Sequence, residues 1–232
     1  MNVIHESLGR LAGTARRLAS QLAAGLGREP DWVKKKRTVD AQFDATLGVE
    51  TGGITELNRL RVAGDATDSV AHIASDPDEF SSALQALGIH DFSRFTFADL
   101  GAGKGRALLL AARHGFRKIV GVEFARELVE VAQRNIRIAG KPIAERTSIV
   151  QQDAGAYDLP DDPLVLFMYN PFGAKTMAAV ARRARASFDR NPRPLHVVYV
   201  VPMHLEPWIE AGFTADRRDH FAILRPVTST PH

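Results

Sequence analysis

Three glycines at alternate positions, Gly101, Gly103 and Gly105, follow Asp99 at the end of an apolar run. The run before them is typical of a strand, and Ala107-Leu108-Leu109-Leu110-Ala111-Ala112 after them is typical of a buried helix. Glycine leaves room for a ligand to approach the backbone where a side chain would block it. Because ligands of parallel α/β sheets bind outside the carboxyl ends of the strands, this turn predicts the mouth of a binding site.

Other polar residues follow later predicted strands: Glu123 comes after residues 119–122, Asp153 after 148–152 and Asn170 after 164–169. Glu123 stands 24 residues beyond Asp99, and a carboxylate there can accept hydrogen bonds from both hydroxyls of a ribose. An acid at the end of a strand is common by itself, but together with the glycine turn at this separation it indicates a cofactor-binding site.

Two familiar nucleotide-binding patterns fit the glycine turn poorly. A phosphate-binding P-loop needs Gly-x-x-x-x-Gly-Lys-Ser/Thr, but Ala98 stands at the first glycine and Gly105 at the hydroxyl position. A dinucleotide fingerprint needs Gly or Ala where the chain has Arg106. A nucleotide-dependent oxidoreductase stays as a weaker alternative.

The sequence Asp99-Leu100-Gly101-Ala102-Gly103-Lys104-Gly105 resembles motif I of the class I S-adenosylmethionine-dependent methyltransferases, and the resemblance covers roughly residues 76–226. It implies S-adenosyl-L-methionine as cofactor, with Asp99 and the Gly101 region beside the charged methionine half. It also implies that Asp153 and the Ala154 amide meet the adenine, although Asp153 is equally placed to cap a helix. The implied cofactor site comprises Asp99, Gly101, Ala102, Gly103, Gly105, Glu123, Phe124, Asp153, Ala154 and Asn170.

Asn170-Pro171-Phe172 resembles the Asn/Asp-Pro-Pro-aromatic motif of amino-group methyltransferases, and Val122-Glu123 with Asn170 is more loosely similar to lysine methyltransferases of the Dot1 type. The resemblance implies that Asn170 holds the attacking nitrogen and that Phe172 stacks on the substrate. The chain has one proline where the motif has two, so a simple strand-terminating turn is an alternative. The catalytic candidates are Asn170, Pro171, Phe172, Tyr169 and His72, with His196 and His204 as further candidates for a general base.

A regular alternation of apolar runs from residue 76 onward positions these residues. Strands are predicted near 95–100, 117–123, 147–152, 164–169 and 195–201, and helices near 104–114, 125–139, 173–188 and 203–211. Asp76-Pro77-Asp78-Glu79 begins a further helix, which Gly88 ends. Residues 213–218 and 220–225 are too close for a crossover helix and predict an antiparallel hairpin.

The alternation and the resemblance together predict an α/β fold: a Rossmann-like, doubly wound, mostly parallel seven-stranded sheet that ends in the antiparallel hairpin, with an amino-terminal helical extension.

The amino-terminal segment has a different composition. The first 40 residues hold eight Lys/Arg and four Asp/Glu, whereas the remainder holds 22 and 23. Residues 5–26 predict an amphipathic helix, Lys34-Lys35-Lys36-Arg37 a solvated basic run, and Thr51-Gly52-Gly53 a turn in a weakly periodic lead-in. We divide the chain into a basic arm (1–37), a lead-in or cap segment (38–75) and a methyltransferase domain (76–232), and we expect at most weak contact of the arm with nucleic acid or an acidic surface.

Composition excludes several classes of protein. The length of 232 residues and the 45% hydrophobic content suit one α/β domain with an added segment. The absence of cysteine excludes disulfides and thiolate metal sites, and no clustered His, Asp and Glu spacing predicts a metal. No apolar run approaches a membrane span or a signal-peptide core, so a cytoplasmic location is expected.

The function predicted from the sequence is methyl transfer from S-adenosylmethionine to a nitrogen or oxygen nucleophile. The substrate is unidentified, and a small molecule and a protein amine both remain open. A non-catalytic S-adenosylmethionine-binding protein is the other alternative.

Overall fold

The computed structural model describes residues 31–55 and 72–228, with the side chains of residues 54, 55 and 72 left out. The amphipathic helix predicted over residues 5–26 lies outside this range. Within the described residues, no helix has both the length and the apolarity that a bilayer span requires.

Seven strands form one sheet in the order β5-β4-β3-β6-β7-β9-β8. The parallel strands are β3 (Thr96–Leu100), β4 (Lys118–Glu123), β5 (Thr147–Gln151), β6 (Leu164–Tyr169) and β7 (Leu195–Val200). The edge hairpin consists of β8 (Phe213–Arg217) and β9 (Phe221–Pro226), and β9 runs antiparallel to β7. The predicted Rossmann-like sheet is confirmed, and each strand lies within one residue of its predicted bounds.

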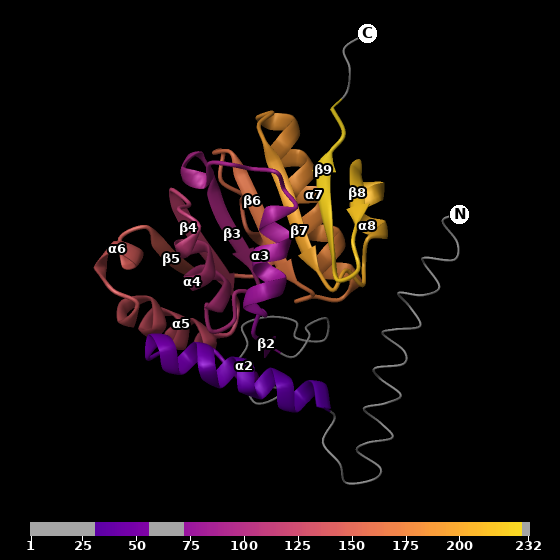
Figure 1. Cartoon of the computed structure of the whole chain (residues 1–232). Helices are drawn as coiled ribbons and strands as arrows, with labels where there is room; N and C mark the ends of the chain where they lie inside the picture. Colours follow the sequence, from indigo (N-terminus) through magenta and orange to yellow (C-terminus); the bar gives the residue numbers. More distant parts are fainter. Residues whose placement is uncertain (1–30, 56–71, 229–232) are drawn as a thin grey trace.

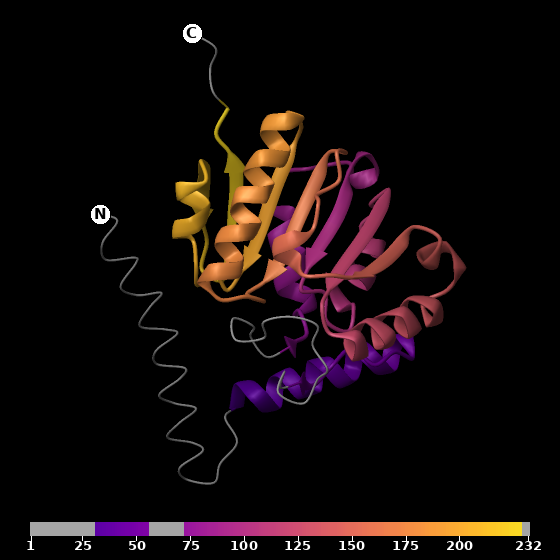
Figure 2. The ribbon, with the colours of Figure 1, turned by 180° about the vertical axis from the view of Figure 1, so that it is seen from behind.

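The helices alternate with the strands as predicted. They are α3 (Pro77–Gln85), α4 (Arg106–Arg113), α5 (Arg126–Ile138), α6 (Lys141–Ala144), α7 (Ala174–Arg190) and α8 (Glu206–Glu210), with the short 3-10 helices η3 (Phe92–Arg94) and η4 (Ala154–Ala156). The predicted start of α3 is confirmed because the Asp76 carboxylate accepts the backbone amides of Asp78 and Glu79. Figures 1 and 2 show α3 and α4 on one face of the sheet and α7 on the other.

Alternate residues of the central strands enter two different cores. Phe97 packs with α3 and α4, whereas Ala98 and Leu100 pack with α7 and α8. Because successive strand side chains point to opposite faces, a strand covered on both faces is mostly apolar, and β3 is buried at all five positions, including the polar Thr96 and Asp99. This packing brings the carboxyl ends of β3, β4 and β6 to one edge of the sheet.

One helix, α2 (Asp31–Leu47), is not predicted by the sequence analysis, which ends the arm at residue 37 and places a weakly periodic lead-in after it. Only Asp40 and Phe43 of this helix are buried, so it has no apolar stripe from which a helix could be recognised. Figure 1 shows α2 alongside the carboxyl ends of the strands. It leads to β1 (Ile54–Thr55), which pairs with β2 (His72–Ile73).

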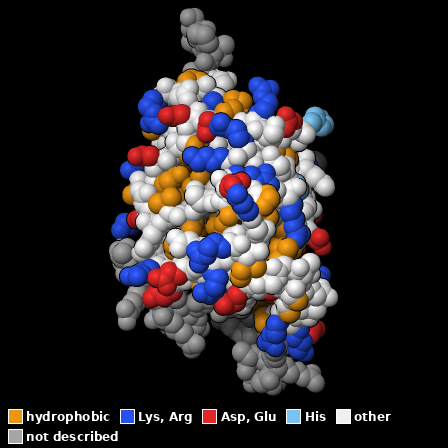
Figure 3. Space-filling view, turned by 90° about the vertical axis from the view of Figure 1, so that its left-hand side faces the viewer, with side chains coloured by type: hydrophobic (Ala, Val, Ile, Leu, Met, Phe, Trp, Pro, Cys, Tyr) orange, Lys and Arg blue, Asp and Glu red, His pale blue; other side chains and the backbone are white. Residues whose placement is uncertain are grey.

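The basic run Lys34-Lys35-Lys36-Arg37 lies in α2. Three of its members are exposed, as expected, but Lys36 is not: its side chain is 14% exposed and pairs with Asp40. The interpretation of the run as a solvated face is therefore wrong for Lys36. Elsewhere, the face drawn in Figure 3 intersperses basic, acidic and apolar side chains, as solvated surfaces usually do.

Candidate functional site

The glycine turn connects β3 to α4, and its three glycines all have positive φ angles: +84° at Gly101, +53° at Gly103 and +86° at Gly105. A side chain at these angles is strained, which by itself favours glycine. A Cβ atom on Gly101 would also lie 2.4 Å from Cβ of Pro171. The backbone therefore accounts for all three glycines, and packing against Pro171 also accounts for Gly101, whereas the ligand clearance that the sequence analysis inferred stays a prediction.

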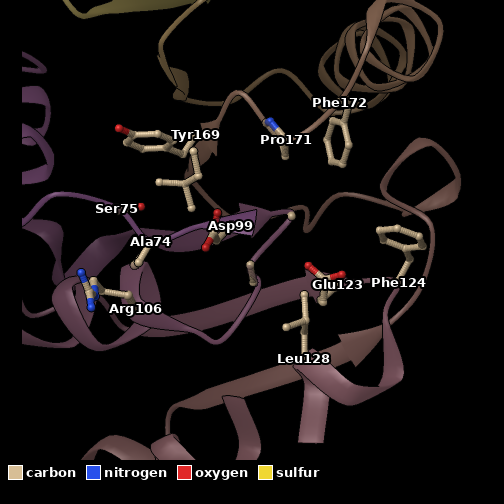
Figure 4. Close-up of a pocket in the computed structure, with 14 residues that line it drawn as sticks. Ala74, Ser75, Asp99, Arg106, Glu123, Phe124, Leu128, Tyr169, Pro171 and Phe172 are labelled. Carbon is tan, nitrogen blue, oxygen red and sulfur yellow. The ribbon is translucent and has the colours of Figure 1, made fainter. Parts of the chain in front are cut away.

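A cleft opens beside this turn at the carboxyl ends of β3, β4 and β6, with about 590 Å³ of empty space counted out to the solvent. Figure 4 shows side chains from all three strand ends around it. The lining residues are Ile73, Ala74, Ser75, Asp99, Gly101, Ala102, Arg106, Ala107, Glu123, Phe124, Leu128, Tyr169, Pro171 and Phe172.

Glu123 closes β4 with a rigidly held carboxylate that is 4% exposed. Its Oε2 accepts the amide of Gly103 and its Oε1 accepts the amide of Ala125, each at 2.9 Å. Burial raises the pKa of Glu123, and the backbone hydrogen bonds oppose that rise. The Phe124 amide also contributes to this lowering, and the acceptor capacity of the two oxygens that remains is available to donors in the cleft.

Asp99 lies one strand away and is 3% exposed. Burial, with a smaller contribution from the charge of Glu123, raises the pKa of Asp99 to about 8. Across residues 31–55 and 72–228 we find no hydrogen bond or ion pair to its carboxylate. A buried carboxyl without a cation partner is costly when ionised, so a positively charged ligand group would stabilise it.

The end of β6 supplies a neutral wall. Tyr169, Pro171 and Phe172 all line the cleft, and the Tyr169 hydroxyl donates to Oε2 of Glu79 on α3 at 3.3 Å. In Figure 4 the rings of Phe172 and Phe124 lie on the Glu123 side of the cleft, away from Tyr169. The cleft thus has an aromatic end at Phe124 and Phe172 and a more polar end at Tyr169.

Asn170 lies beside this wall but is not among the residues that line the cleft. Its φ angle is +40°, and its Oδ1 accepts a hydrogen bond from the hydroxyl of Tyr199 at 3.3 Å. That hydroxyl in turn accepts the amide of His204 at 3.3 Å. Tyr199 is buried, and burial raises its pKa to about 12. The side-chain oxygen of Asn170 is therefore engaged on the β7 side, and its role at the substrate stays a prediction.

Asp153 and Ala154 lie at η4, outside the lining of the cleft. The carboxylate of Asp153 accepts the amide of Gly155 at 2.7 Å, which confirms that it caps η4. Its predicted contact with adenine is compatible with this cap but stays a prediction.

The histidine candidates fall in different places. The side chain of His72 lies outside the described residues. His196 is at the start of β7, the opposite end of the strand from the cleft, and burial together with Arg225 lowers its pKa to about 4. His204 contacts Tyr199 through its backbone amide. Among the proposed bases whose side chains the structure describes, Tyr169 is the one that lines the cleft.

Arg106 is the site residue that the sequence analysis missed. It lines the cleft, is 2% exposed, and pairs with Asp40 and Asp44 of α2. Two signals were present in the sequence: an arginine in place of a fingerprint glycine, and two aspartates four residues apart, a spacing that puts both on one face of a helix. In the part of the chain that the structure describes, no group of His, Asp and Glu is arranged to hold a metal ion.

Comparison with known proteins identifies this region. Residues 97–189 match a family model described as a methyltransferase domain. A search of curated proteins found no match.

Solved structures similar to this chain include two methyltransferases. One is a predicted N6-adenine-specific DNA methylase from Listeria monocytogenes, 14% identical, with a TM-score of 0.50 over 72% of this chain and 53% of that one. Another is an RNA methyltransferase from Salinibacter ruber in complex with S-adenosyl-L-homocysteine, 21% identical, with a TM-score of 0.45 over 66% of this chain and 92% of that one. At 14% identity the likeness to the Listeria protein concerns the fold.

Proposed function

The chain is a class I S-adenosylmethionine-dependent methyltransferase, and from that premise we propose that it methylates a nitrogen or oxygen nucleophile held at the polar end of the cleft. One observation carries the proposal: the glycine turn, two buried carboxyls and an aromatic wall meet in a single cleft at the carboxyl ends of β3, β4 and β6. The oxidoreductase alternative has no support in the matched family.

The residues of the cleft fit the cofactor in three respects. Glu123 lines the cleft with a carboxylate fixed by backbone amides, and its remaining acceptor capacity suits ribose hydroxyls. Asp99 suits an ammonium group, because a cation would stabilise the ionised form of this buried carboxyl. Phe124 and Phe172 offer apolar surface to a purine ring.

S-adenosylmethionine supplies a methyl group already activated by a positively charged sulfur. The work left to the chain is therefore to orient the nucleophile, within about 3–3.5 Å of the methyl carbon and in line with the leaving sulfur, and to exclude water. Tyr169 and Pro171 border the place where the acceptor would lie. An amine must arrive unprotonated, which a desolvated cleft favours, whereas an alcohol needs a base, for which Tyr169 is the candidate at the cleft.

Calorimetry with S-adenosylhomocysteine tests the cofactor assignment. We expect micromolar affinity for the wild type and at least a tenfold loss in Glu123→Ala and in Asp153→Ala, equivalent to about 1.4 kcal/mol each. Because Glu123 also binds two backbone amides, thermal unfolding of the variant must show that the domain is intact. Glu130→Ala, which removes an exposed carboxylate of α5, is the matched control and should bind normally. Unchanged affinity in both site variants would overturn the placement of the nucleoside.

A non-catalytic S-adenosylmethionine-binding protein is the second candidate, favoured by the engagement of Asn170 with Tyr199 instead of the cleft. Incubation with methyl-labelled cofactor and fractionated small molecules or proteins separates the two. Labelled product supports the enzyme, and its chemical class decides between a small-molecule acceptor and a protein amine. Cofactor binding without labelled product in any fraction supports the binding protein.

A further inference from the structure

One wall of the cleft is shared by two parts of the chain that are far apart in the sequence. Arg106, in the first turn of α4, lines the cleft, and its side chain is 1% exposed. Its Nε donates to Oγ1 of Thr51 at 2.7 Å, one terminal nitrogen pairs with Asp40, and the other lies 3.4 Å from Asp44. Each of the three guanidinium nitrogens thus has a partner within residues 40–51. The Arg106 side chain therefore lines the cleft while its polar atoms bind residues 40–51.

The charges in this network compensate one another. Two cations, Arg106 and Lys36, meet two carboxylates, Asp40 and Asp44. The guanidinium also lies 4.7 Å from the centre of the Phe43 ring. A buried ion pair is strongly destabilised when one partner is removed, because the other charge stays behind without compensation. The position of α2 therefore depends on Arg106.

Thr51 connects the guanidinium to the chain that follows α2. Its hydroxyl accepts from Arg106 and donates to Oδ1 of Asp44 at 2.5 Å. The other oxygen of Asp44 accepts the amides of Thr51 and Gly52 at 2.9 and 2.8 Å. One hydroxyl thus couples the first turn of α4 to the turn at Thr51-Gly52.

A second anchor joins the same segment to the glycine turn. The side chain of Asn135 donates to the carbonyls of Glu50 and Lys104, and its Oδ1 accepts the amide of Glu50. Lys104 also donates to the carbonyl of Gly52 at 3.0 Å. Residues on both sides of Gly105 are therefore tied to residues 50–52.

We infer that Arg106 and Thr51 are positioning residues for the cofactor: they hold residues 40–52 against the glycine turn and so keep the turn in its binding shape. The inference rests on the proposed function, because it concerns the same cleft. Since coupling between two sites is reciprocal, a cofactor that binds the docked form must also stabilise the docking of residues 40–52.

Substitutions at Thr51 test this more cleanly than substitutions at Arg106, which leave buried charge behind. Thr51→Val removes the hydroxyl with little change in shape, and Thr51→Ser keeps it. Thr46→Val is the control, because that threonine lies on the exposed face of α2 and bonds only within the helix. Two quantities are measured for each protein: the affinity for S-adenosylhomocysteine by calorimetry, and the hydrogen exchange of residues 44–53 by mass spectrometry with and without that ligand.

We expect S-adenosylhomocysteine to slow exchange of residues 44–53 in the wild type. Thr51→Val should bind at least fivefold more weakly and exchange faster in that segment, while Thr51→Ser and Thr46→Val behave like the wild type. Normal affinity of Thr51→Val, or an equal loss in Thr46→Val, would overturn the inference and leave the proposed function standing. A wild type that does not bind the ligand would instead overturn the proposed function.

Discussion

The two walls of the cleft differ in the partners of their polar groups. The first wall, at the ends of β3 and β4, holds the buried carboxyls of Asp99 and Glu123. The second wall, at the end of β6, holds Tyr169, and Asn170 lies beside it. Both residues are only half-buried, and the Tyr169 hydroxyl and the Asn170 side-chain oxygen bond to side chains of other elements. The first wall therefore holds carboxyls whose ionised form a ligand cation can stabilise, whereas the second wall consists of neutral side chains that bond within the chain.

This difference indicates which wall tolerates change. An uncompensated buried carboxyl costs stability and is retained where a ligand uses it. A neutral hydrogen bond contributes only about 0.5–1.5 kcal/mol, so it can be lost without loss of the fold. The following predictions test this contrast.

The largest effect is expected behind the first wall. Arg106→Met leaves Asp40 and Asp44 without the guanidinium, and the free energy of unfolding should fall by about 3–5 kcal/mol. Urea denaturation measures it. Arg126→Met, which breaks an exposed pair with Glu130, is the control and should cost less than about 1 kcal/mol. An equal loss of unfolding free energy in the two variants would show that the buried ion pairs stabilise the fold no more than an exposed pair does.

Asp99→Asn should change stability and binding in opposite directions. The folded protein keeps the proton of Asp99 up to about pH 8, whereas the unfolded chain releases it near pH 4, so wild-type stability from this group falls as the pH rises between these values. The Asp99→Asn variant has no carboxyl that ionises at this position, so its stability does not fall in this way. At pH 8 it should be more stable by at least about 1.4 kcal/mol, a difference that disappears near pH 4.

The same variant should bind S-adenosylhomocysteine at least tenfold more weakly at pH 8, because an amide cannot pair with the ammonium. Denaturation from pH 4 to pH 9 and calorimetry measure the two effects. Asp158→Asn, on an exposed carboxylate, should alter neither. A pH-independent difference between wild type and Asp99→Asn would contradict the raised pKa.

Tyr199→Phe probes the second wall. It removes the hydroxyl that links Asn170 to the amide of His204, and the cost should be about 1 kcal/mol of unfolding free energy. Affinity for S-adenosylhomocysteine should stay within twofold, because Tyr199 does not line the cleft. Denaturation and calorimetry check this, with Tyr157→Phe as a control on a partly buried tyrosine. A tenfold loss of affinity would mean that the two walls are not separable.

The smallest effect concerns the backbone of Asn170. Both Asn170→Gly and Asn170→Ala lose the bond from Tyr199, but only glycine accepts a φ of +40° without strain. Asn170→Gly should therefore unfold at a higher temperature than Asn170→Ala, by about 0.5–1 kcal/mol in stability. The reverse order would show that φ at this position relaxes freely.

The parts of the fold that the sequence predicts are those whose signals are local. Apolar runs, the Asp76 cap and the glycine turn each lie within a few residues, and they place β3, α4 and the two carboxyls of the first wall correctly. The hairpin is predicted for the same reason, since its strands are too close for any other connection.

The parts of the structure that the sequence does not predict depend on residues that are distant in the sequence. Helix α2 is held by Arg106, 62 and 66 positions from its aspartates, and it buries too few apolar residues to show a period. The direction of the Asn170 side chain is set by Tyr199, 29 residues away. Neither partner can be identified from the residues next to these positions.

The contact between Gly101 and Pro171 has a consequence for how such a cleft can evolve. The two walls touch there, and a single methyl group on Gly101 would overlap the proline ring. A larger residue at position 101, after β3, would thus require a smaller one at position 171, after β6. We expect homologues with a larger residue at one of these positions to have a smaller residue at the other. A substitution at position 171 that is meant to change the methyl acceptor would also alter the contact with Gly101. We expect such a substitution to change the affinity for the nucleoside first.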